Sequence, residues 1–172
     1  MKTELHREQL SAKGFRFAIV VSRWNDELTS RLAEGAVESL TSVGASEDSI
    51  EIFHVPGSFE LPLACLKTAE SGDFDAVIAL GVVIRGDTPH FDYVAGQTAS
   101  GIMQASMQTG VPVLFGVITA DNIEQAEKRS GKKADNKGYE AALSAVEMVN
   151  LFRKIGKSNK QGGGDKVFQN VV

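Results

Sequence analysis

Four short apolar runs alternate with longer stretches of helical periodicity along this chain. We expect the runs at residues 15–22, 50–55, 76–84 and 113–118 to form strands, because they are rich in β-branched residues. In the stretches after them, apolar residues recur every three or four positions, as in amphipathic helices. Strands that alternate with helices pair in parallel through right-handed crossovers, with helices on both faces of the sheet. The sequence therefore predicts one α/β domain around a central parallel sheet of about four strands.

Capping and breaking residues delimit the expected helices, which fall at residues 26–44, 58–70, 89–109, 121–129 and 139–153. Thr88 and Pro89 are residue types preferred at the N-cap and the first helical position of the third helix. Asp121 and Glu124 have the spacing of a capping box for the fourth. We expect three parts: a polar N-terminal segment (1–14), the domain (15–155) and a flexible, glycine-containing C-terminal tail (156–172).

Composition and charge argue against several classes of function. The chain has 172 residues and a net charge of −4, which gives no electrostatic case for binding nucleic acid or an anionic membrane. The single cysteine, Cys65, lies in an apolar helical stretch, where we expect a buried, inert thiol. No His, Cys and carboxylate grouping has metal-site spacing, so no metal is expected. The sequence has neither a secretory h-region nor a long apolar run, so we expect a cytoplasmic protein.

Polar and aromatic residues collect in the loops after the expected strands. In open parallel sheets, ligands bind outside the carboxyl ends of the strands, so these loops are the candidates for a site. They read SRWND, VPGSFE, IRGDTPH and VITADN. Three of the four contain aromatic, charged or glycine-rich chemistry, which predicts a ligand site at this edge of the sheet.

The segment ALGVVIRGDTPHFDYV, at residues 79–94, is the strongest candidate. Its strand ends in a glycine-containing loop that leads into a helix N-terminus, where free N–H groups and the helix dipole favour an anion. His90 lies on the first turn of that helix, and imidazole is a good general acid or base. We predict that a phosphorylated small molecule binds at the loop and that His90 transfers protons; a structural role for His90 is the alternative. His54 alternates within an expected strand, which favours a structural role.

Four further residues have weaker signals. Trp24 either stacks on a planar heterocycle or fills the sheet edge. Glu60 either contacts a ligand or only complements a helix dipole. Phe59 and Phe115 are expected in the core.

A basic cluster falls between the last two expected helices. Its residues are Arg129, Lys132, Lys133 and Lys137. The cluster is either a solvated face or an anion clamp, and Arg129 is the member best suited to bidentate phosphate binding.

Five blocks of this sequence together resemble the lumazine synthase family. They are SRWND, VPGSFELP, ALGVVIRGDTPHFDYV, PVLFGVIT and NIEQAEKRSGKKADNKG, in the order and spacing of the family. The resemblance implies a flavodoxin-like three-layer sandwich, with helices on both faces of the sheet. It also implies a transferase of riboflavin biosynthesis that needs no metal or organic cofactor. The implied reaction condenses 5-amino-6-ribitylaminouracil with 3,4-dihydroxy-2-butanone 4-phosphate, which gives 6,7-dimethyl-8-ribityllumazine, phosphate and water.

The resemblance also implies roles for individual residues. Proton transfer falls to His90. The residues implied to hold the ribityl-pyrimidine are Trp24, Ser58, Phe59, Glu60, Val82, Val83, Ile84, Phe115 and Lys137. Of these, Phe115 and Lys137 match positions that a neighbouring subunit contributes. The residues implied to bind the phosphate are Gly86, Asp87, Thr88 and Arg129.

Assembly and alternatives follow from the same resemblance. Family members form pentamers with active sites between adjacent subunits, and many build icosahedral shells with riboflavin synthase as a partner; pentamer, decamer and shell all stay open here. Two departures are Asp87, in a loop where neutral residues are frequent, and Asp135, where the family often has Gly. The alternatives to lumazine synthesis are a non-catalytic lumazine- or flavin-binding or shell protein of this fold, and an archaeal-type riboflavin synthase.

Overall fold

The structure, a computed structural model, describes residues 10–161, with side chains to residue 156. The strands in this part of the chain are β1 (Phe17–Ser22), β2 (Ile50–Val55), β3 (Ala76–Ile84) and β4 (Val113–Ala120). The α-helices are α1 (Asp26–Ser42), α2 (Leu61–Glu70), α3 (His90–Thr109), α4 (Ile123–Arg129) and α5 (Lys137–Gln161). Short 3-10 helices are η1 (Glu47–Ser49), η2 (Ser58–Glu60) and η3 (Lys133–Asp135).

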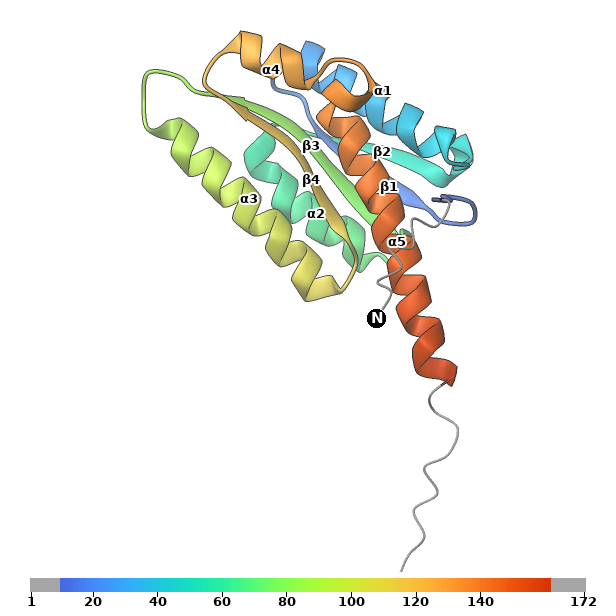
Figure 1. Cartoon of the computed structure of the whole chain (residues 1–172). Helices are drawn as coiled ribbons and strands as arrows, with labels where there is room; N and C mark the ends of the chain where they lie inside the picture. Colours follow the sequence, from blue (N-terminus) through green and yellow to red (C-terminus); the bar gives the residue numbers. More distant parts are fainter. Residues whose placement is uncertain (1–9, 162–172) are drawn as a thin grey trace, which may run out of the picture.

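The strands form one parallel sheet in the order β2-β1-β3-β4. Helices α1 and α5 cover one face, and α2 and α3 cover the other (Figure 1). Each face has its own apolar core, because β1 and β3 send alternate side chains to opposite sides. The predicted flavodoxin-like, three-layer α/β sandwich is confirmed.

The two central strands are buried as their continuous apolar runs predict. All six residues of β1 are buried, and so are the first seven of β3. The edge strand β2 differs, since Ile52 and His54 are exposed on the side that faces α1. Cys65 is fully buried in α2, and desolvation raises the pKa of its thiol to about 12, which agrees with an inert thiol.

Two predicted helix starts are wrong by one position. Pro89, not Thr88, is the N-cap of α3, and His90 is its first residue; no side chain among the described residues caps this end. At α4 the N-cap is Asn122, whose side-chain oxygen accepts a hydrogen bond from Gln125 N at 2.9 Å. The Gln125 side chain in turn accepts a hydrogen bond from Asp121 N. The two side chains that cap α4 are therefore those of Asn122 and Gln125, and not those of Asp121 and Glu124.

Element ends also differ from the prediction. β1 begins two residues later than predicted, although Phe15 still packs in the core, and β4 runs two residues further, to Ala120. α5 begins at Lys137 and continues to Gln161, beyond the predicted end at Arg153. The part of the predicted flexible tail after Gln161 lies outside the described residues.

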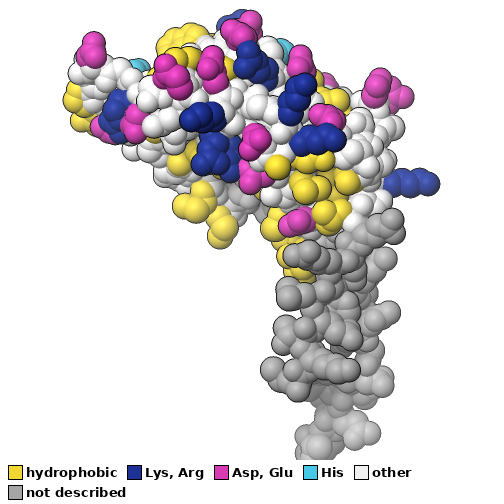
Figure 2. All heavy atoms as spheres, turned by 45° about the horizontal axis from the view of Figure 1, so that its top comes forward, with side chains coloured by type: hydrophobic (Ala, Val, Ile, Leu, Met, Phe, Trp, Pro, Cys, Tyr) yellow, Lys and Arg dark blue, Asp and Glu magenta, His cyan; other side chains and the backbone are white. Residues whose placement is uncertain are grey.

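Charged side chains of both signs share the surface of the molecule. Figure 2 shows Lys and Arg side chains interspersed with Asp and Glu on one face, with no field of a single sign. Among the described residues, no helix has the length and apolar character to cross a membrane.

Candidate functional site

A cavity of about 200 Å³ lies at the carboxyl end of the sheet, between the loops that follow β1 and β3 and the start of α3. Its lining residues are Trp24, Asn25, Ser58, Val82, Val83, Ile84, Gly86, Thr88, His90, Phe91 and Val94. The structure thus brings together the expected aromatic residue, the end of β3, the glycine loop and the histidine. This agrees with the rule that places ligands at the carboxyl ends of parallel strands.

The loop after β1 presents Trp24 to the cavity. Its backbone N–H donates to Pro56 O at 3.2 Å, and a Cβ at Gly57 would lie 3.2 Å from the indole Cε3 atom. The indole is therefore seated against the Gly57 backbone, where a Cβ would push it outward by a few tenths of an ångström. Trp24 is 66% exposed, so it does not fill the sheet edge, and its remaining surface is free to stack on a ligand.

Ser58 and Glu60 lie in η2, the turn before α2. The Glu60 carboxylate accepts a hydrogen bond from Gly57 N at 2.9 Å, and Thr98 Oγ1 of α3 donates to Ser58 O at 3.0 Å. Ser58 is buried at the cavity, where Gly81 gives it room: a Cβ at Gly81 would lie 2.6 Å from Ser58 Oγ. Glu60 is exposed, lies outside the cavity lining, and stabilises the turn that holds Ser58.

His90 is the first residue of α3 and is exposed at the cavity with Gly86 and Thr88. In the described part of the chain, no hydrogen bond or ion pair engages its imidazole, so both ring nitrogens are free to exchange protons. Asp87, between the two loop residues, is exposed and does not line the cavity. Its carboxylate therefore leaves the loop backbone open to an anion.

Arg85, which sequence reasoning missed, fixes this loop. Its Nε donates to Asp121 Oδ1 at 3.1 Å, its guanidinium lies 3.1 Å from Asp92 Oδ1, and its Cζ lies 4.1 Å from the Phe91 ring centroid. The hydrogen bond to Asp121, followed by that to Asp92, raises the pKa of Arg85. The only signal in the sequence was the cation itself, since Arg85 lies in a loop, Asp121 follows the neighbouring strand and Asp92 lies on the next helix.

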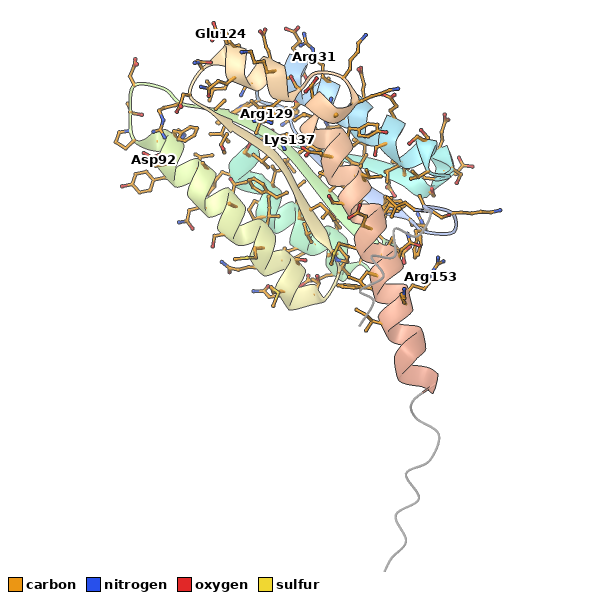
Figure 3. All side chains as sticks on the ribbon, viewed as in Figure 1. Arg31, Asp92, Glu124, Arg129, Lys137 and Arg153 are labelled. Atoms are coloured by element: carbon orange, nitrogen blue, oxygen red, sulfur yellow. The ribbon has the colours of Figure 1, made fainter. Side chains whose placement is uncertain are left out.

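Arg129, Lys137 and Phe115 do not line the cavity. Arg129 ends α4 and Lys137 begins α5, on the α5 side of the sheet, whereas Asp92 lies on α3 (Figure 3). Arg129 is exposed and has no ion pair within the described residues, while Lys137 pairs with Glu140. Within the described residues, Arg129, Lys132 and Lys133 are thus the exposed cluster members without an ion pair, and Arg129 is the one suited to bidentate phosphate binding.

Phe59 and Phe115 are not core residues, which corrects the prediction made from residue type alone. Phe59 is 57% exposed and Phe115 is 44% exposed. Phe115 lies on β4, an edge strand, and Phe59 lies on a short turn, so the described part of the chain leaves much of both rings uncovered.

The segment before Lys137 is held by Asn136. Asn136 Nδ2 donates to Arg31 O and to Gly131 O, both at 2.9 Å, and its Oδ1 accepts from Tyr139 N at 3.0 Å. Asp135, the departure from the family pattern, has no positive φ and so does not need the conformational freedom of glycine.

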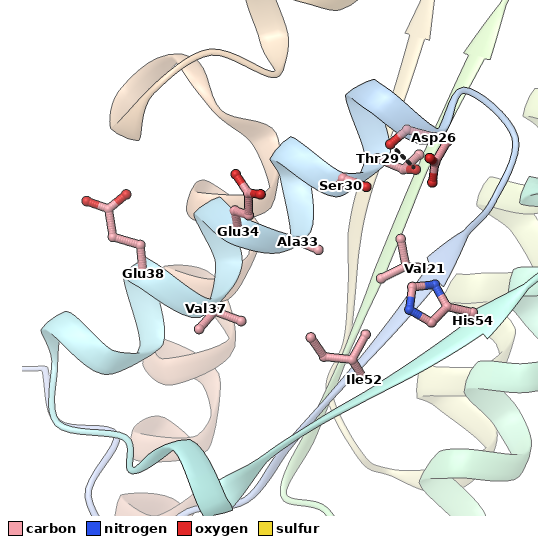
Figure 4. A pocket seen from close by; sticks show the side chains of 10 residues that line it. All are labelled: Val21, Asp26, Thr29, Ser30, Ala33, Glu34, Val37, Glu38, Ile52 and His54. Atoms are coloured by element: carbon pink, nitrogen blue, oxygen red, sulfur yellow. Dashed lines mark hydrogen bonds between the residues drawn. The ribbon is translucent and has the colours of Figure 1, made fainter.

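A larger cavity, about 520 Å³, lies between α1 and the edge strand β2 (Figure 4). Its lining combines Val21, Ile52 and Val37 with His54 and the acids of α1. His54 is exposed at this cavity, and the described residues form no cluster of His, Cys, Asp and Glu suited to a metal. The smaller cavity therefore remains the candidate site, because only it contains the loop chemistry.

Comparison with known proteins agrees with this geometry. A family model described as 6,7-dimethyl-8-ribityllumazine synthase matches residues 14–153. A protein of that name from Chlorobium luteolum is 56% identical over 146 residues, which cover 85% of this chain and 94% of the relative. Another from Chlorobium chlorochromatii is 53% identical over 155 residues (88% and 100%), and one from Syntrophus aciditrophicus is 55% identical over 147 residues (86% and 96%). The chain therefore belongs to the 6,7-dimethyl-8-ribityllumazine synthase family.

Proposed function

We propose that this protein condenses 5-amino-6-ribitylaminouracil with 3,4-dihydroxy-2-butanone 4-phosphate, and so forms 6,7-dimethyl-8-ribityllumazine in riboflavin biosynthesis. The observation that carries the proposal is the cavity at the carboxyl end of the sheet. There Trp24, the end of β3, the Gly86–Thr88 loop and His90 lie together in a chain of this family.

The pyrimidine half of the cavity lies between Trp24 and the end of β3. The exposed indole suits stacking on a planar heterocycle, and the backbone of Val82–Ile84 can recognise the polar edge of the ring. Ser58, Phe59 and Glu60 lie beside Trp24 through Gly57, where Glu60 has a second carboxylate oxygen for a ribityl hydroxyl.

The phosphate half is the loop of Gly86, Asp87 and Thr88 at the N-terminus of α3. Free N–H groups and the dipole of this 20-residue helix favour an anion there. Arg85 cannot supply the balancing charge, because two carboxylates already engage it. Arg129, which has no ion pair in the described part of the chain, supplies it instead.

His90 transfers the protons that the reaction needs. The amine of the pyrimidine attacks the ketone carbonyl, and a Schiff base forms with loss of one water. Phosphate then leaves by elimination, and ring closure onto the remaining carbonyl, with loss of a second water, gives the lumazine. Each step moves a proton to or from nitrogen, carbon or oxygen, for which an exposed imidazole is suited. Holding two substrates together can contribute about 7–11 kcal/mol, so much of the rate enhancement comes from proximity.

The site is completed by a neighbouring copy of the chain. At about 200 Å³, the cavity is smaller than usual ligand sites of about 300–1,000 Å³, although it must hold two substrates. Phe115 and Lys137, and with them Arg129, lie outside it and are supplied by the adjacent subunit of a pentamer, whose larger form is an icosahedral shell. The exposed apolar residues Leu63, Tyr93 and Met107 support burial between subunits. We place the protein in the cytoplasm, with a riboflavin synthase as the partner that consumes its product.

The test mixes purified protein with both substrates and follows the absorbance and fluorescence of lumazine, beside a control without protein. Acceleration over the control supports the proposal. A rate equal to the control would leave a non-catalytic binding or shell protein, and consumption of added lumazine with formation of riboflavin would indicate a riboflavin synthase.

A further inference from the structure

Asn25 follows Trp24 in the loop after β1 and has an unusual conformation. Its φ of 61° and ψ of 45° are left-handed, and among the described residues only Lys133 is another non-glycine residue with positive φ. Asn tolerates this region better than most residues because its side chain can form local hydrogen bonds.

An asparagine at the N-cap of a helix usually caps it with its own side chain. Asn25 is the N-cap of α1, yet its side chain makes no capping bond; its backbone O instead accepts from Leu28 N and Thr29 N. Its side-chain Nδ2 donates to Val82 O at 2.9 Å. The side chain is thus diverted from its helix to the end of β3.

The acceptor, Val82 O, lies on the part of β3 that extends beyond its pairing with β1. Val77 N and Arg85 N donate toward the β4 side at 2.9 Å each, and alternate residues of a strand face the same neighbour, so Val82 and Ile84 face the β1 side. Pairing with β1 stops at Leu80. Asn25 therefore satisfies Val82 O, and the backbone groups of Ile84 remain for a ligand.

We infer that Asn25 is a positioning residue that fixes the Trp24 indole relative to the end of β3, and so sets the affinity for the pyrimidine substrate. The inference rests on the proposed function, since it assumes that a pyrimidine lies between these two groups. Apart from the hydrogen bond from its backbone N–H to Pro56 O, Trp24 has little other support: its ring is 66% exposed and contacts Gly57 on one side. The hydrogen bond from Asn25 to Val82 O connects the loop that carries Trp24 to the end of β3, whose backbone recognises the edge of the pyrimidine ring.

The test compares Asn25→Gly and Asn25→Asp with the wild-type protein. Glycine keeps the left-handed conformation and removes the donor, while aspartate keeps the size and cannot donate. Trp24 is the only tryptophan of the chain, so its emission reports this loop alone. We expect both variants to raise the KM for the pyrimidine about tenfold, with kcat and the KM for the phosphorylated substrate within about twofold of wild type.

Asn122→Gly is the matched control, because Asn122 is an N-cap that does cap its own helix, with Gln125 N at 2.9 Å. It should lower the Tm and leave the KM for the pyrimidine unchanged. If both Asn25 variants also leave that KM and the Trp24 emission anisotropy unchanged, the inference is wrong.

Failure of the proposed function can be distinguished from failure of the Asn25 inference. In that case wild-type protein forms no lumazine, and the Trp24 anisotropy still decides the positioning role. A lower Trp24 anisotropy in Asn25→Gly than in wild type supports the positioning role of Asn25, and equal values overturn it.

Discussion

Arg85 and Asp121 join the ends of β3 and β4 through a hydrogen bond of 3.1 Å from Nε to Oδ1. The same guanidinium reaches Asp92 on the first turn of α3 and stacks on Phe91, beside His90. One side chain therefore connects two strand ends with the helix that begins at the histidine. The phosphate loop, which lies between Arg85 and His90, is held at both ends.

Arg85→Lys and Arg85→Gln test this connection. Lysine keeps the charge and loses both the planar fork and the stacking on Phe91, so it should restore activity only in part. We expect kcat/KM for the phosphorylated substrate to fall in both variants, more in Arg85→Gln, while the Tm changes little because the pairs are exposed. Equal activity of both variants and wild type would contradict a role in holding the loop.

Arg129→Ala should chiefly weaken the phosphorylated substrate. Loss of a charge-assisted contact predicts a rise of about 10- to 100-fold in its KM, with the KM for the pyrimidine unchanged. Arg31→Ala is the matched control, since Arg31 is an arginine that already pairs with Glu27. Steady-state kinetics with each substrate varied in turn makes the measurement. If Arg129→Ala behaves like the control, Arg129 is not the phosphate ligand.

Gly138→Ala should destabilise the fold. A Cβ at Gly138 would lie 2.0 Å from Leu32 O, where α5 meets α1, and backbone cannot move aside cheaply. We expect a loss of about 3 kcal/mol in the free energy of unfolding, near the upper end for overpacking. Gly156→Ala, also on α5, meets nothing within 4 Å and should be neutral or stabilising. Denaturant titration of both variants measures their free energies of unfolding. Equal values would show that the contact between the new methyl group and Leu32 O is relieved without loss of stability.

Cys65 predicts a pH dependence in alkaline solution. Its folded pKa of about 12 exceeds the ordinary value of 9.0, so the unfolded chain releases the proton first as pH rises. The contribution to stability is complete below the ordinary pKa and is lost as pH rises from there through the folded pKa. Cys65→Ala should therefore lose less stability than wild type between about pH 9 and 12, the range between the ordinary and the folded pKa of the thiol. Parallel stability curves for the two proteins would argue against this.

The sequence predicted the sheet well, because burial on both faces makes β1 and β3 continuous apolar runs. It also predicted the segment around His90, since a strand, a glycine loop and a helix start are all local signals. Phe59 and Phe115 were misplaced because residue type says nothing about which surface an edge strand or a turn leaves uncovered. Arg85 and Asn25 could not be found from the sequence, since their partners, Asp121 and Val82, lie 36 and 57 residues away.

The most direct test of the account measures lumazine formation by wild-type protein and His90→Ala with both substrates. We expect clear acceleration by the wild type and a loss of about 10- to 100-fold in kcat for the variant, with the KM values retained. Some catalysis should remain in His90→Ala, because the variant still holds the substrates together. Unchanged turnover in His90→Ala would remove the proton-transfer role, and a wild-type rate equal to the uncatalysed reaction would contradict the proposed enzyme itself.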